Sequence, residues 1–162
     1  VLDVMDMGLL VIDYKRRKVE FAGANIPCFK VRALDPDETE QWQAGEFEAE
    51  EGAISNGKFL LETVNASKMP VGFSLRMDQE FALNEWEFEK DVSFYLVTDG
   101  YSDQFNGVTG RKFMKRNLKK LLLDVQDFKM TRQKDILEER FNSWMGKAPQ
   151  LDDVLIIGLR AE

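Results

Sequence analysis

Two apolar stretches of this sequence end beside aspartates, and these aspartates are the side chains best suited to chemistry. Residues 93–97 lead through Thr98 into Asp99, and further along the chain Asp152 and Asp153 come directly before an apolar run at 154–157. Apolar runs of this length predict buried strands. If the two strands lie side by side, their carboxylates form a cluster of hard oxygen ligands, which suits Mg²⁺ or Mn²⁺.

The residues after Asp99 favour a compact loop. Gly100 permits a sharp turn and a close approach of the backbone to a ligand. Asp103 follows, and it reaches the same pocket if the loop begins a helical turn. The alternative interpretation is that these aspartates form turns and cap a helix. Asp152 and Asp153 could likewise serve only to form a turn. Two adjacent negative charges, however, cost free energy unless a cation compensates them.

A basic block lies on the helix predicted over residues 111–126. Its members are Arg111, Lys112, Lys115, Arg116, Lys119 and Lys120. One interpretation is a rim that attracts a phosphate or an acid close to the Asp103 loop, and the other is the solvated face of the helix. The block is locally positive, although the net charge of the chain is −7, so the first interpretation is worth testing.

Composition bounds the class of protein. The 162 residues, 44% hydrophobic and 31% charged, fit one soluble globular domain. The net charge of −7 argues against a general nucleic-acid binder. No stretch reaches the roughly 20 apolar residues of a membrane span, and no signal peptide is visible.

Histidine is absent and cysteine occurs once. Ser-His and Cys-His nucleophiles within the chain are therefore excluded, as are zinc sites built on histidine or several thiolates. We interpret Cys28 as a small core residue rather than a reactive thiol, and a single cysteine fits a reducing, cytoplasmic compartment.

Apolar periodicity predicts the elements that must position these side chains. Strands are expected at 7–12 and 19–23 as a hairpin, at 27–32 paired with 59–64, and at 81–88, 93–97 and 154–159; helices are expected at 111–126 and 131–145, the second capped by Thr131. Strands and helices are segregated along the chain, which favours an α+β fold. Residues 33–57 are acidic without Lys or Arg and read as a solvated, mobile loop. The alternative is an acidic docking surface or an extra cation site.

Five pieces of the sequence, in order, resemble the SpoIIE-like branch of the metal-dependent type 2C (PPM) serine/threonine protein phosphatases. They are residues 7–13, 19–25, 68–72, 98–103 and 152–155. The last two pieces are similar to the final two metal motifs of that family. The resemblance covers nearly the whole chain except residues 33–57, which look like an insertion.

The resemblance implies two packed, mainly antiparallel β-sheets flanked by helices, with two Mn²⁺ or Mg²⁺ ions at one edge. A water that the metals activate would hydrolyse phosphoserine or phosphothreonine. By this resemblance Asp99 and Asp152 are metal ligands, Asp153 is the neighbour of the second ligand, and Asp103 is an accessory acid. The implied partners are a phosphorylated STAS-type anti-anti-sigma protein and a sensor or signalling domain upstream. The parent protein would be cytoplasmic or anchored to a membrane.

The chain departs from the family at its beginning. The family's first metal motif, an Asp-Gly loop with the bridging aspartate, lies upstream of the first hairpin, and Asp3 and Asp6 lack its glycine pattern. We therefore expect the chain to be the C-terminal part of the domain, with weak metal binding and little activity alone. A sheet edge left open would favour pairing with a second copy as a homodimer. The alternative function is a phosphatase-like module that binds its partner without catalysis.

Overall fold

The computed structural model describes residues 3–72 and 79–161. Its strands are β1 (Val4–Met5), β2 (Met7–Asp13), β3 (Lys18–Ala24), β4 (Cys28–Ala33), β5 (Ile54–Ser55), β6 (Phe59–Val64), β7 (Val71–Gly72), β8 (Leu83–Glu87), β9 (Ser93–Val97) and β10 (Ile156–Arg160). Its helices are α1 (Pro36–Ala44), α2 (Gly100–Asp103), α3 (Lys115–Asp124) and α4 (Met130–Met145).

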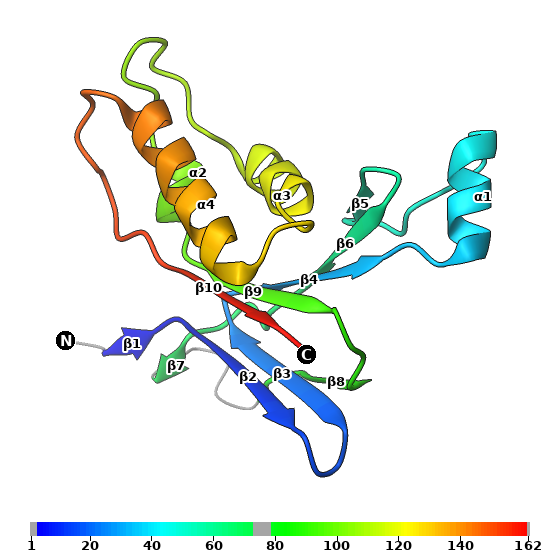
Figure 1. The fold of residues 1–162 in the computed structure, drawn as a ribbon. Helices are drawn as coiled ribbons and strands as arrows, with labels where there is room; N and C mark the ends of the chain where they lie inside the picture. Colours follow the sequence, from blue (N-terminus) through cyan, green and yellow to red (C-terminus); the bar gives the residue numbers. More distant parts are fainter. Residues whose placement is uncertain (1–2, 73–78, 162) are drawn as a thin grey trace.

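These elements form three layers (Figure 1). A five-stranded sheet in the order β10-β9-β4-β6-β5 lies in the middle, with α3 and α4 on one face and the three-stranded sheet β2-β3-β8 on the other. The strands named here pair antiparallel, and β1 and β7 form a separate short pair. The predicted α+β class with packed antiparallel sheets is confirmed.

Two apolar cores hold the layers together. Between the helices and the five-stranded sheet, the core includes Tyr95, Tyr101 and Leu122. Between the two sheets, Phe21 of β3 and Cys28 of β4 are both fully buried. Cys28 is thus a core residue, as predicted, and burial raises the pKa of its thiol to about 12.

Hydrogen bonds to two buried tyrosines tie the helices to the strands. The Tyr95 hydroxyl on β9 donates to Oε1 of Gln133 at 2.5 Å and accepts from Nε2 of Gln126 at 2.7 Å. The Tyr101 hydroxyl on α2 donates to the carbonyl oxygen of Leu137 on α4 at 2.8 Å. Buried polar groups require such partners, so α2, α4 and β9 are held in one arrangement.

The predicted strand pairings are largely confirmed. The hairpin forms between β2 and β3, with Met7 opposite Ala24 and Asp13 opposite Lys18. The predicted pairing across the insertion also forms, between β4 and β6. Within residues 68–72, whose Pro70 and Gly72 favour a compact turn, Val71 and Gly72 instead form β7 and pair with β1.

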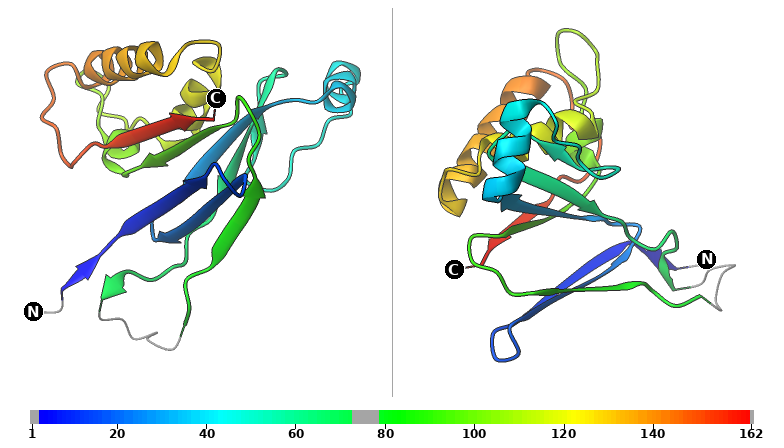
Figure 2. Two further views of the ribbon diagram at one scale, coloured as in Figure 1. Left: turned by 60° about the horizontal axis from the view of Figure 1, so that its bottom comes forward. Right: turned by 90° about the vertical axis from the view of Figure 1, so that its right-hand side faces the viewer.

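The interpretation of residues 33–57 as a mobile loop is wrong, because α1 lies within them. Asp35 accepts a hydrogen bond from the backbone N–H of Glu38, whose side chain accepts from the Asp35 N–H, and Pro36 follows the cap. This capping box stabilises the first turn. Arg32 then donates to both carboxylate oxygens of Glu38, at 2.6 and 2.7 Å. Figure 2 shows α1 standing apart from α3 and α4, and none of its residues is buried.

Both long helices begin elsewhere than predicted. The helix expected from residue 111 starts at Lys115, because Met114 has φ 76° and cannot continue a right-handed helix. Thr131 is not the cap of α4, which begins at Met130 after Lys129. The Gln133 side chain, which donates to the carbonyl oxygen of Phe128 at 3.0 Å, fixes the entry to this helix. No helix among residues 3–72 and 79–161 is long and apolar enough to cross a membrane.

Candidate metal centre

The two predicted aspartate positions lie side by side because β9 and β10 are neighbours. Val97 is opposite Ile156 in their antiparallel register. Asp99 therefore follows the end of β9 at the place where Asp152 and Asp153 precede β10. A cavity of about 280 Å³ is lined by all three aspartates. The prediction that the two strand ends meet is thus confirmed.

Thr98 joins the two strand ends. Its hydroxyl donates to the carbonyl oxygen of Asp153 at 2.8 Å and accepts from the backbone N–H of Leu155 at 2.9 Å. Its backbone N–H donates to the Leu155 carbonyl oxygen at 3.0 Å. One residue thereby holds the backbone beside Asp99 against the backbone beside Asp153.

The close approach of the two strand ends also requires a glycine at position 100. A side chain at this position would collide with the carbonyl oxygen of Asp153. Gly100 was predicted to let the backbone approach a ligand; in the structure it approaches the backbone of Asp153. Asp99 precedes α2, but its side chain makes no capping hydrogen bond to that helix. Asp99 thus occupies the N-cap position of α2 without using its carboxylate there.

The adjacent aspartates use their oxygens differently. Oδ1 of Asp152 accepts from the backbone N–H of Asp153 at 2.7 Å, and its carbonyl oxygen accepts from Nε2 of Gln150 at 2.8 Å. Both aspartates are exposed. Each side chain thus retains carboxylate oxygen for a cation.

The accessory residues of the prediction do not all reach this cavity. Asp103 and Lys112 form an ion pair at 3.4 Å, and neither of them nor Arg111 lines the cavity. Lys115, the first residue of α3, does line it. Lys119 lies elsewhere, where it donates to the Gly52 carbonyl oxygen at 3.0 Å; burial, with a smaller effect of Lys115, lowers its pKa.

Among the residues of the cavity that sequence reasoning missed, Asp6 and Asn25 have side chains that could bind a cation. Asp6, between β1 and β2, and Asn25, at the end of β3, both line the cavity, and Nδ2 of Asn25 donates to Oδ1 of Asp6 at 2.7 Å. Asp6 carries no periodic or glycine signal. Asn25 has φ 61°, a backbone conformation that asparagine adopts more readily than most residues, and its position at the end of a predicted strand was the available signal.

The donor chemistry of the cavity suits a hard divalent cation, since carboxylates are the ligands that Mg²⁺ and Mn²⁺ prefer. The geometry is incomplete, however. Among the residues that the structure describes, no three Asp, Glu, His or Cys side chains stand close enough together to hold a metal ion. The described residues therefore do not form a finished metal site by themselves.

Comparison with known proteins identifies the fold. No protein-family model and no curated protein matches the chain, whereas solved structures do. The SiaA-PP2C domain of Pseudomonas aeruginosa matches with TM-score 0.71 and 24% identity, over 97% of this chain and 52% of that one. The manganese-presoaked phosphatase domain of the cell fate determinant SpoIIE from Bacillus subtilis matches with TM-score 0.54 and 12% identity, over 97% and 56%.

The chain thus has the fold of PP2C-type phosphatase domains, the family that its motifs resemble. It spans about half the length of the two solved domains, 52% and 56%. At identities of 24% and 12% the likeness concerns the fold.

Proposed function

We propose that this chain is part of a metal-dependent protein serine/threonine phosphatase domain of the SpoIIE-like kind. Asp99 and Asp152 would ligate Mn²⁺ or Mg²⁺, with Asp153 as the neighbour of the second ligand. The observation that carries the proposal is the cavity that joins the ends of β9 and β10 and contains all three aspartates. It lies on a fold shared with PP2C-type phosphatase domains.

The chain's own contribution is to position carboxylates. In metal-dependent phosphatases, bound cations acidify a water and neutralise phosphoryl oxygens. Here the Thr98 hydroxyl binds the Asp153 carbonyl oxygen, and the lack of a side chain at Gly100 lets the two segments approach, so that Asp99 lies beside Asp153. Since three suitable side chains do not converge in the described residues, the proposal includes at least one further carboxylate from residues outside this chain.

The proposed substrate is phosphoserine or phosphothreonine on a STAS-type anti-anti-sigma partner, under the control of an upstream sensor domain in a cytoplasmic or membrane-anchored parent. The resemblance of the motifs and the structural likeness to the SpoIIE phosphatase domain support this class. Lys115 at the cavity adds a cation that suits a phosphate group.

A second candidate function is a phosphatase-like module that binds its partner without hydrolysis. The incomplete ligand set favours it, because a protein needs only the surface of the fold for recognition. The two candidates differ in whether a longer polypeptide that contains this chain completes the carboxylate set.

Titration of the 162-residue chain with Mn²⁺ by calorimetry tests the proposed ligands. We expect weak, millimolar binding, with Asp99→Asn and Asp152→Asn each lowering the affinity by at least about tenfold. Asp103→Asn is the matched control, because Asp103 pairs with Lys112 outside the cavity. Tight binding of two ions, or rapid phosphate release by the chain alone, would contradict the incomplete site.

The same Asp99→Asn change in the longer protein separates the candidates. If the longer protein is a phosphatase, the variant should no longer release phosphate from its phosphoprotein. If it is a binding module, the unchanged protein releases no phosphate, and the variant should keep its affinity for the partner. Unchanged metal binding and unchanged phosphatase activity would show that Asp99 serves only the turn.

A further inference from the structure

Most of the basic block of the sequence lies along one side of helix α3. Residues three or four apart share a face of a helix. Lys115 and Lys119 have this spacing, and so do Arg116 and Lys120. We call these four side chains the basic stripe. Lys119 is half-buried and the other three are exposed, while the remaining two residues of the block precede the helix.

The basic stripe begins at the candidate metal centre. Lys115 lines the same cavity as Asp99 and Asp152. One turn further along α3, Nζ of Lys119 lies 5.7 Å from the centre of the Phe29 ring, and Phe29 also lines the cavity. The stripe therefore extends from the edge of the cavity onto the exposed surface of the helix.

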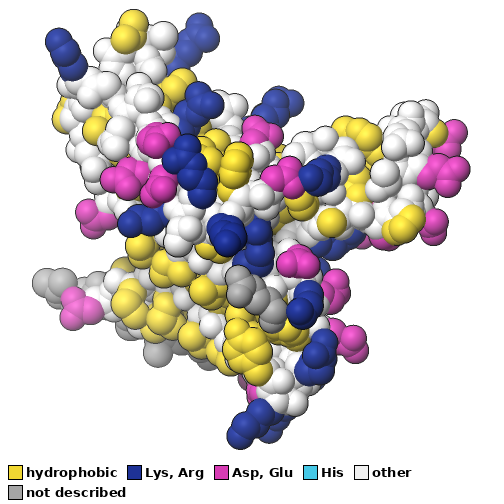
Figure 3. Space-filling model, viewed as in Figure 1, with side chains coloured by type: hydrophobic (Ala, Val, Ile, Leu, Met, Phe, Trp, Pro, Cys, Tyr) yellow, Lys and Arg dark blue, Asp and Glu magenta, His cyan; other side chains and the backbone are white. Residues whose placement is uncertain are grey.

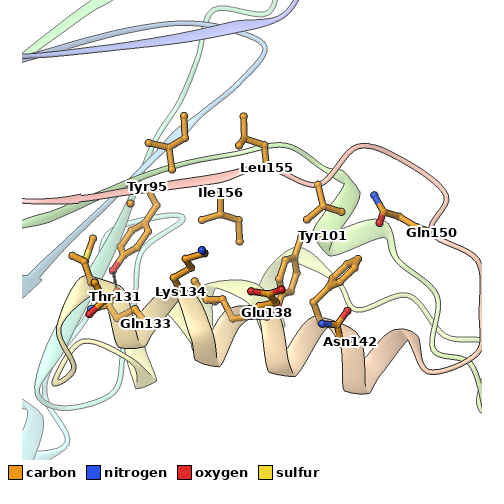
Figure 4. Close-up of a pocket in the computed structure, with 16 residues that line it drawn as sticks. Tyr95, Tyr101, Thr131, Gln133, Lys134, Glu138, Asn142, Gln150, Leu155 and Ile156 are labelled. Carbon is orange, nitrogen blue, oxygen red and sulfur yellow. Dashed lines mark hydrogen bonds between the residues drawn. The ribbon is translucent and has the colours of Figure 1, made fainter.

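The charges of the stripe are not neutralised by nearby acids. None of its four side chains forms an ion pair with a residue that the structure describes. Helix α4 differs, because Arg132 there pairs with Asp135 and Glu139. Figure 4 also shows the oppositely charged Lys134 and Glu138 on one side of α4. The stripe is thus a surface of a single sign, whereas α4 carries both signs.

Much of the negative charge of the chain lies elsewhere. Residues 33–57 are acidic and contain no Lys or Arg. Asp and Glu side chains gather at the far right of Figure 3, where Figure 1 places α1. Residues 111–120, by contrast, contain no Asp or Glu. The stripe is therefore locally positive on a chain whose net charge is −7.

This arrangement costs α3 stability. Cations in the first turn of a helix oppose its macrodipole, and like charges four residues apart repel each other. The first turn of α3 has no acidic residue and no capping side chain. Burial, with a smaller effect of Lys115, lowers the pKa of Lys119. A bound anion would relieve this repulsion, which a face with both signs of charge would not contain.

We propose, on the basis of the proposed phosphatase function, that the basic stripe binds acidic residues next to the phosphorylated residue of the substrate protein. Between Lys115 and Lys120 the helix rises about 7.5 Å, and an extended peptide rises about 3.3 Å per residue. The stripe therefore matches two or three residues of a substrate whose phosphate lies at the cavity. The substrate class is a phosphoserine or phosphothreonine segment with Asp or Glu directly to one side.

A short acidic segment fits this surface better than a nucleic acid does. The stripe has only four cations, and the rest of the chain is strongly acidic. A long polyanion would extend beyond the stripe and meet that repulsive field. An acidic segment of a few residues contacts the stripe alone.

Fluorescence anisotropy of labelled phosphoserine peptides with the 162-residue chain, at low salt, tests the docking surface. One peptide carries three glutamates before the phosphoserine, a second carries them after it, and a third has glutamine in their place. We expect one of the two acidic peptides to bind at least about fivefold more tightly than the glutamine peptide. Added salt should remove the difference, because it screens exposed charges.

Two double variants locate the preference on the molecule. Arg116→Gln with Lys120→Gln should remove most of the preference for the acidic peptide, because it removes two cations of the stripe. Lys134→Gln with Arg140→Gln is the matched control. It removes the same charge from exposed positions of α4, so it should leave the preference unchanged.

Equal affinity for the acidic and glutamine peptides contradicts the proposal, and so does a preference that only the α4 variant removes. Tighter binding of a single-stranded oligonucleotide through Arg116 and Lys120 would identify a nucleic-acid surface instead. The Mn²⁺ titration of Asp99→Asn separates this proposal from the phosphatase function. If that variant binds Mn²⁺ unchanged while the stripe prefers acidic peptides, the metal centre fails and the docking surface stands; the opposite pair of results overturns only the docking surface.

Discussion

At the scale of single residues, Thr98 matters as much as the aspartates beside it. Carboxylates on two strands remain close only if the strands cannot slide or splay, and Thr98 supplies that constraint through one hydroxyl and one backbone N–H. Its side chain is the same size as valine, which allows the hydrogen bonds to be removed without loss of volume.

Thr98→Val should lower the free energy of unfolding by about 1–3 kcal/mol, because the Leu155 N–H and the Asp153 carbonyl oxygen lose their partner. It should also weaken Mn²⁺ binding, since the two strand ends separate. Thermal or denaturant unfolding and calorimetry measure both effects. Thr63→Val is the control, because the Thr63 hydroxyl donates to Gly52 in the same sheet but outside the cavity. An unchanged metal affinity in Thr98→Val would show that the aspartates do not depend on this bond.

Cys28 offers a simple check of the inter-sheet core. The thiol is fully buried, and burial raises its pKa to about 12. The native protein at pH 8 should therefore react with an aromatic disulfide reagent only as fast as it opens, and the unfolded protein at once. Rapid reaction of the native chain would place Cys28 outside the core.

The sequence predicted that the aspartates at the ends of two strands lie together, but not which other residues line the cavity beside them. Asp99, Asp152 and Asp153 were predictable because a buried strand fixes where its flanking residues lie. Asp103 was assigned to the same pocket on proximity in sequence, whereas the turn directs it to Lys112. The place of Asp6 in the cavity depends on the path of the chain between β1 and β2, which no local sequence pattern predicts.

At the scale of elements, α1 shows how a short motif outweighs composition. Its acidic content predicts a loop, yet the Asp35-Glu38 capping box and the Arg32 contact suffice for a helix that has no buried residue. A helix without a buried face gains little from tertiary packing. Its cap and ion pair therefore carry an unusually large part of its stability.

Asp35→Ala should cost about 1 kcal/mol of helix stability. Because α1 is peripheral, the loss should appear as faster amide exchange within residues 36–44, with little change in the global melting temperature. Glu40→Ala leaves the cap intact and serves as the control. A global destabilisation equal to the local one would show that α1 is coupled to the core.

The ion pair to Arg32 makes this helix sensitive to acid. The hydrogen bonds from Arg32 lower the pKa of Glu38 from 4.5 to about 2. A lowered folded-state pKa stabilises the fold above the unfolded value, and this contribution is lost as the pH falls through the folded value. Amide protection of α1 should therefore decline between about pH 4.5 and 2, and Glu38→Gln should abolish that dependence. A decline of the same size in Glu38→Gln would assign it to other carboxylates.

At the scale of the whole molecule, the apolar patterns and the separation of strands from helices along the sequence predicted the α+β class and most strand pairings. β-Strands of period two and helices of period 3.6 leave distinct apolar patterns, so β2, β3, β4 and β6 were found near their true bounds. The start of α3 was not predicted. Met114 has a left-handed backbone conformation, which a glycine usually marks in a sequence, but this residue is a methionine.

The neighbouring position of β9 and β10 has a consequence for how the site comes into being. Cys28 pairs with Leu96, and Val97 pairs with Ile156, so the cavity gathers segments from three distant parts of the chain. Such non-local pairings form late in folding, because the entropy cost of closing the long loops comes before the contacts that offset it. During synthesis, Asp6 and Asp99 leave the ribosome long before Asp152. The cavity therefore assembles only once the segment around Asp152 has joined β9.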